Sequence, residues 1–67
     1  MKGKLLASSP TLDGAKKQAG AYFYDPEFKT LRFHENGEVV TLSNSRGALD
    51  GYRIIKARKR YRFEMVI

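Results

Sequence analysis

The chain has 67 residues, eight of them aromatic and none of them cysteine, so it can form one small core but neither a disulfide nor a thiolate metal site. Thirteen Lys and Arg residues against seven Asp and Glu residues give a net charge of +6. Six of these cations and no acidic residue lie between Arg53 and Arg62, so the whole net charge comes from that segment.

The first predicted elements are a short strand over Lys2–Ala7 and a helix over Ser9–Ala19. Ser9 is a favourable N-cap, and Pro10 suits the first helical position because its missing N–H would have no partner there. Gly20 follows the helix, where a left-handed C-cap favours glycine. Three residues recur at helical spacing and would share the buried face: Leu12, Ala15 and Ala19.

The aromatic segment Ala21–Asp25 predicts a second strand, because tyrosine and phenylalanine favour extended backbone. Alternation along this strand would place Tyr22 and Tyr24 on one face of the sheet. Asp25 and Pro26 favour a turn, and we expect the strand to end there.

Asn36 and Gly37 predict a β-hairpin, because this pair is favoured at the centre of a two-residue type I′ turn. In that register the hairpin has one apolar face made of two opposed pairs: Phe33 with Val40, and Leu31 with Leu42. Polar and glycine-rich residues follow, and we expect a loop over Ser43–Gly51.

Tyr52–Ile67 predicts a long strand, because β-branched and aromatic residues alternate with cations along it. Sixteen extended residues would span ~53 Å, more than the ~28 Å diameter of a compact chain of this length. Because no Gly, Pro or Asn marks a tight turn near Arg58–Arg60, we expect one bent strand there; a helix starting at Asp50 is the alternative. Alternation leaves Arg53 and Lys59 on one face. The other face carries four cations: Lys56, Arg58, Arg60 and Arg62.

Together these elements predict an α+β fold: a small, curled antiparallel sheet of four to five strands with one short helix, in the order β-α-β-β-β-β. The expected core draws on all of the elements: Leu5, Leu12, Ala15, Phe23, Leu31, Phe33, Val40, Leu42, Ile55, Phe63 and Met65. A core this small, with exposed strand edges, is compatible with a homodimer.

Hydropathy favours a soluble protein. The N-terminal apolar run Leu5–Ala7 is shorter than the ~7–15-residue core of a signal peptide, and no stretch approaches the ~20 apolar residues of a membrane span. We therefore expect a cytoplasmic protein without a membrane partner, in which residues 1–67 form a single domain.

The basic segment predicts a small, non-enzymatic protein that binds nucleic acid, either DNA or RNA. Same-face residues two apart on a strand are about 6.6–7 Å apart, close to the separation of successive phosphates, so several cations could neutralise phosphates together. The predicted interface adds a neighbouring arginine and two tyrosines that could stack on bases: Arg53, Lys56, Arg58, Arg60, Arg62, Arg32, Tyr22 and Tyr24.

Two other functions remain open. A basic strand or a sheet edge could dock on an acidic protein, as in a small inhibitor or adaptor. His34, the only histidine, could act with Glu35 as the general base of a small ribonuclease. The sequence contains no motif of a phosphate-binding loop, serine hydrolase or zinc protease, and its acidic residues are scattered. We therefore expect no enzyme activity, no cofactor and no metal.

Overall fold

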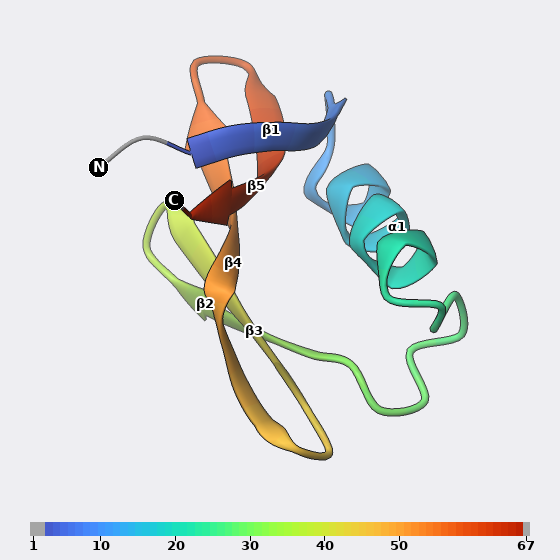
Figure 1. Ribbon diagram of the computed structural model, residues 1–67. Coiled ribbons are helices and arrows are strands. Elements are labelled where there is room, and N and C mark those ends of the chain that lie inside the picture. Colours follow the sequence, from blue (N-terminus) through green and yellow to red (C-terminus); the bar gives the residue numbers. More distant parts are fainter. Residues whose placement is uncertain (1–2, 67) are drawn as a thin grey trace.

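The computed structural model describes residues 3–66 and shows the predicted α+β class (Figure 1). Its elements are β1 (Gly3–Ser9), α1 (Leu12–Tyr22), β2 (Arg32–Asn36), β3 (Val39–Asn44), β4 (Gly47–Ala57) and β5 (Arg60–Val66). Within these residues, five antiparallel strands form one sheet in the spatial order β1-β5-β4-β3-β2, and α1 covers one of its faces. The chain order β-α-β-β-β-β is the predicted one, although different residues form two of the strands.

Helix α1 begins at Leu12, three residues later than predicted. Ser9 is the last residue of β1 rather than the N-cap. Thr11 takes that role, and its hydroxyl accepts a hydrogen bond from the N–H of Gly14 at 3.1 Å. The Thr11 hydroxyl therefore satisfies one of the N–H groups that the first helical turn leaves without a partner.

The predicted strand Ala21–Asp25 is wrong, because α1 continues to Tyr22 and a turn follows. Gly20, predicted as the C-cap, lies inside the helix. Its lack of a side chain lets a ring approach, since a Cβ there would lie 2.7 Å from Cε1 of Phe28. The N–H of Phe23 still donates to a helix carbonyl at 3.0 Å and ends α1. The packing of Tyr22 and Phe23 against Phe63 therefore outweighs the preference of these rings for a strand.

The loop between α1 and β2 is organised by the carboxylate of Asp25. It accepts hydrogen bonds from the backbone N–H groups of Leu31, Thr30 and Lys29 at 2.9, 3.0 and 2.8 Å. These bonds hold the pKa of Asp25 below its usual value, and the bond from Leu31 has the largest effect. They also bring Leu31 into the core, where it is 2% exposed.

The β2–β3 hairpin forms as predicted, but its register is shifted by two residues. Asn36 pairs with Val39, so Gly37 and Glu38 form the two-residue loop. Gly37 has a φ of 67° and Glu38 is not among the residues with positive φ, which fits a type II′ turn rather than type I′. Because side chains alternate with period two, a shift of two residues keeps each of them on its predicted face.

Most of the predicted loop Ser43–Gly51 is also strand. β3 continues to Asn44, β4 begins at Gly47, and only Ser45 and Arg46 form the turn between them. Gly47 supports this tight connection with a φ of 122°, a conformation that other residues rarely adopt. The polar composition that predicted a loop reflects a hairpin that is largely exposed at this end.

The predicted single strand over Tyr52–Ile67 is wrong, because it breaks at Arg58 and Lys59 into β4 and β5. Ala57 pairs with Arg60 around this two-residue turn, and Arg58 has a φ of 59°. An arginine in this left-handed conformation costs ~1–2 kcal/mol. The pairing of β4 with β5 offsets that cost, and two shorter strands fit a molecule whose longest extent is 31 Å.

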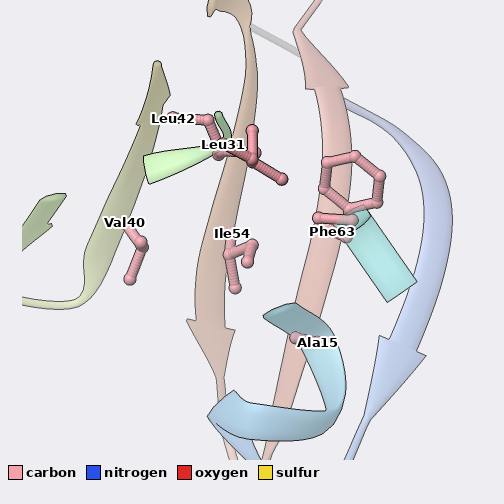
Figure 2. Close-up of a cluster of buried hydrophobic side chains, with 7 residues drawn as sticks. Ala15, Leu31, Val40, Leu42, Ile54 and Phe63 are labelled. Carbon is pink, nitrogen blue, oxygen red and sulfur yellow. The ribbon is translucent and has the colours of Figure 1, made fainter. Parts of the chain in front are cut away.

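The core lies between α1 and the covered face of the sheet (Figure 2). Its buried hydrophobic residues are Ala15, Ala19, Leu31, Val40, Leu42, Ile54 and Phe63. The prediction that Ile55 belongs to the core is wrong, because Ile54 is the residue of β4 that faces the helix. The prediction that Leu5 belongs to the core is also wrong, since this residue is 47% exposed. An irregularity between Leu5 and Ala7 leaves Leu6 packed against the core instead.

Candidate nucleic-acid interface

Strand pairing decides which cations share a face. Ile54 and Phe63 pair with each other and are buried against the helix, so the residues that alternate with them face away from it. On β4 and β5, three cations lie on that side of the sheet, the open face: Arg53, Arg60 and Arg62. The prediction that Lys56 shares a face with Arg60 and Arg62 is wrong. Lys56 pairs with Tyr61 on the covered face, because the two-residue turn changes which residues of β4 and β5 lie on the same side.

Residues Lys56–Arg60, the basic tip, form the end of the β4–β5 hairpin. All of them are exposed, and all except Ala57 are cations. The neighbouring strands stop short of this turn, since β3 pairs with β4 only as far as Ile55 and β1 pairs with β5 only as far as Tyr61. The hairpin therefore projects past both neighbours, as Figure 1 shows at the top of the sheet.

The charges of the basic tip are not neutralised within residues 3–66, where none of its cations lies within 4.0 Å of a carboxylate oxygen. Arg60 donates a hydrogen bond from Nε to the hydroxyl of Ser8 at 3.0 Å, which orients the guanidinium without using its terminal nitrogens. The backbone N–H of Lys56 donates to the carbonyl of Glu38 at 3.0 Å. Four positive charges therefore remain on one projecting turn.

Arg53 and Arg62 are held by the carboxylate of Glu64, which is 6% exposed. Arg53 donates from Nε and Nη2 to Oε1 at 3.1 and 3.0 Å, and Arg62 donates from Nε to Oε2 at 2.7 Å. Burial alone would raise the pKa of Glu64, but the hydrogen bonds from Arg62 and Arg53 outweigh it and hold the pKa below its usual value. This cluster keeps a positive charge, since two guanidiniums share one carboxylate.

Arg32 contacts the loop before β2 rather than the other cations. Its Nη1 donates to the carbonyls of Phe28 and Leu31 at 2.9 and 3.0 Å, and its Nη2 donates to that of Lys29 at 3.4 Å. Moreover, β2 lies at the edge of the sheet, with β4 and β3 between it and β5. Arg32 therefore lies on the open face but away from the basic segment, and backbone carbonyls already engage its guanidinium.

The two tyrosines predicted to stack on bases do not lie among the arginines. Tyr22 packs on the covered face against Phe63, with ring centroids 5.4 Å apart, and its hydroxyl lies 3.5 Å from that of Tyr52. The hydrogen bond with Tyr22 raises the pKa of Tyr52. Tyr24 is 95% exposed in the turn after α1, with a φ of 57°. Neither ring therefore belongs to the open face.

His34 lies on the open face of β2, where its Nε2 is 2.8 Å from the hydroxyl of Ser43. The two residues line a hollow of about 270 Å³ between β2, β3 and β4. Glu35 points to the opposite face, and its carboxylate lies 3.6 Å from Nζ of Lys16. The pair suggested for a ribonuclease therefore does not meet. Among the described residues, no three His, Asp or Glu side chains form a group that could hold a metal ion.

Two residues of this surface were missed by the sequence predictions. Glu64 is the only acidic residue in the C-terminal segment, but its contacts with Arg53 depend on a strand pairing that the sequence does not reveal. Ser8 contacts Arg60 from the other end of the chain, and no sequence signal points to it. Lys59 was predicted to lie on the opposite face, whereas it lies beside Arg58 in the turn.

No family model matches the chain, and neither the curated proteins nor the solved structures match it, so its function has to be inferred from its own residues. Within residues 3–66, no helix is both long enough and apolar enough to cross a membrane.

Proposed function

We propose that this protein binds nucleic acid through the basic tip, by contacts with the phosphate backbone. The observation that supports this most strongly is a set of four cations on a projecting turn, with no carboxylate of residues 3–66 at ion-pair distance. A surface that serves only solubility would intersperse charges of both signs. Segregated cations on a paired hairpin instead favour a polyanionic partner.

The arginines of β5 would extend this contact along the open face. Arg60 and Arg62 are two residues apart on one face of the strand, about 6.6–7 Å, which is close to the separation of successive phosphates. Both bond through Nε to a protein oxygen, which leaves their terminal nitrogens without a partner among the described residues. A phosphate chain that contacts Arg58 and Lys59 at the turn could therefore continue over Arg60 to Arg62.

The proposed contact requires charge and shape but no reacting group, so we propose a binding protein without catalytic activity. An acidic protein is the second candidate partner, because the same turn would attract a cluster of carboxylates. The two partners differ in the size of the salt effect, since a nucleic acid releases condensed counterions when its phosphates are neutralised.

A salt titration of binding to a short fluorescent oligonucleotide, followed by anisotropy, tests the proposal. Four phosphate contacts predict a slope of log K against log salt of about −2.8 to −3.6. Arg58→Gln and Lys59→Gln should each weaken binding and make this negative slope less steep by ~0.7–0.9. The effect should not depend on the nucleotide sequence, because phosphate contacts read no bases.

Arg46→Gln is the matched control, because Arg46 also occupies a two-residue hairpin turn, at the opposite end of β4. The 11 residues of β4 separate the two turns. This variant should keep the slope of the wild type. A loss as large as that of Arg58→Gln would mean that only overall charge attracts the oligonucleotide. Unchanged slopes in both tip variants, or no binding at low salt, would overturn the proposal in favour of an acidic protein.

A further inference from the structure

The aromatic side chains of residues 3–66 are separated from the cations of the open face. Strand pairing puts Tyr61 and Phe63 of β5 and Tyr52 of β4 on the covered face, and Phe33 of β2 lies there too. The remaining rings belong to α1 or the loop after it: Tyr22, Phe23, Tyr24 and Phe28. Unpaired bases bind proteins largely by stacking on such rings. Within residues 3–66, the arginines of the open face therefore have no tyrosine or phenylalanine beside them on which an unpaired base could stack.

The cations of the β4–β5 hairpin also lie on both of its faces. Arg60 and Arg62 are on the open face, Lys56 is on the covered face, and Arg58 and Lys59 form the turn between them. A single phosphate chain running along one face could reach only part of this set. A groove of a duplex has a phosphate chain on each side, so both faces of a hairpin inserted into it contact phosphates.

From these two observations we infer that the basic tip binds double-stranded DNA, with the turn inserted into the major groove. The inference rests on the proposed function and narrows it to one class of nucleic acid. In a duplex the bases are already stacked on one another, so phosphate contacts alone provide most of the affinity. An arginine-bearing face without tyrosine or phenylalanine suits such a ligand.

The dimensions of the hairpin agree with the B-form major groove. Paired strands lie ~4.7–4.9 Å apart, and the groove is about 12 Å wide and admits a two-stranded ribbon. Ala57, the small residue opposite Arg60, keeps the hairpin thin next to the turn. The major groove of duplex RNA is deep and narrow, which excludes a ribbon of this kind. We therefore expect a preference for duplex DNA over duplex RNA as well as over single strands.

The test measures affinity at low salt for three fluorescent probes of the same sequence: duplex DNA, single-stranded DNA and duplex RNA. Duplex DNA should bind about tenfold tighter than either of the others. Lys56→Gln and Arg60→Gln, on opposite faces of the hairpin, should weaken duplex binding by similar factors. Arg46→Gln should keep the affinity of the wild type, and melting curves would show that each variant is folded.

The outcomes separate this inference from the proposed function. If none of the three probes binds in a salt-dependent way, the proposed function itself fails. If the probes bind but the single strand or duplex RNA binds as tightly as duplex DNA, only the inference fails. Duplex binding that survives Lys56→Gln and is lost in Arg60→Gln would overturn insertion into a groove. A loss in Tyr24→Ala as large as that in Arg60→Gln would indicate base stacking instead.

Discussion

Replacing Glu64 with glutamine tests whether the arginine cluster on the open face stabilises the fold. Its carboxylate accepts three hydrogen bonds, two from Arg53 and one from Arg62, and it is 6% exposed. Glutamine keeps one acceptor oxygen but turns an amide N–H₂ towards a guanidinium, so donors would face donors. The variant therefore loses charge and hydrogen bonds with little change in side-chain volume.

The expected loss can be estimated from the geometry. A hydrogen bond to a charged group contributes ~1.5–3 kcal/mol when it is buried. The side chains of Arg53 and Arg62 are 26% and 40% exposed, so solvent screens part of this energy. We expect Glu64→Gln to lower the free energy of unfolding by ~2 kcal/mol, a large fraction of the ~3–10 kcal/mol typical of a chain this size. The melting temperature should fall by roughly 8–16 °C.

Urea denaturation at neutral pH measures this loss, and Glu27→Gln is the matched control. Glu27 pairs with Lys29 at 3.3 Å, but both side chains are more than 70% exposed, so the same substitution should cost less than ~0.5 kcal/mol there. A Glu64→Gln variant as stable as Glu27→Gln would refute the stabilising role of the cluster.

The pH dependence gives a second check. Because the pKa of folded Glu64 lies below its usual value, its contribution is complete above the ordinary glutamate pKa of about 4.3 and is lost as the pH falls. The difference between the wild type and Glu64→Gln should therefore shrink at acidic pH. A difference that stays constant from neutral to strongly acidic pH would contradict the assigned ionisation.

Two further substitutions test the backbone of the fold. Gly20→Ala should lower the free energy of unfolding by ~1–3 kcal/mol, although alanine favours helices, because the new Cβ would lie 2.7 Å from Cε1 of Phe28 and 3.0 Å from the carbonyl oxygen of Asp25. Equal or higher stability in urea would show that this close approach is absent. Arg58→Gly should raise the free energy of unfolding by ~1 kcal/mol, because glycine adopts a φ of 59° without strain, and should weaken oligonucleotide binding. A loss of stability in that variant would contradict the left-handed turn.

Several features of this protein could be predicted from local patterns alone. The apolar face of the β2–β3 hairpin survives a register shift of two residues, because alternation has a period of two. The position of the positive charge along the chain does not depend on folding at all. The fold class follows from the same patterns, since one helical repeat and several alternating segments define an α+β chain.

Contacts between distant segments decided the features that these patterns do not contain. The break at Arg58 has no turn signal, because an arginine with positive φ is unfavourable locally and is stabilised only by the pairing of β4 with β5. That break moves Lys56 to the covered face and brings Glu64 opposite Arg53. Tyr22 belongs to the helix rather than to a strand because its ring packs on Phe63, which is 41 residues away in the chain. Packing against such distant residues outweighs local propensity, so only the tertiary structure could place Arg53, Arg60 and Arg62 on the face opposite the tyrosines and phenylalanines of the sheet.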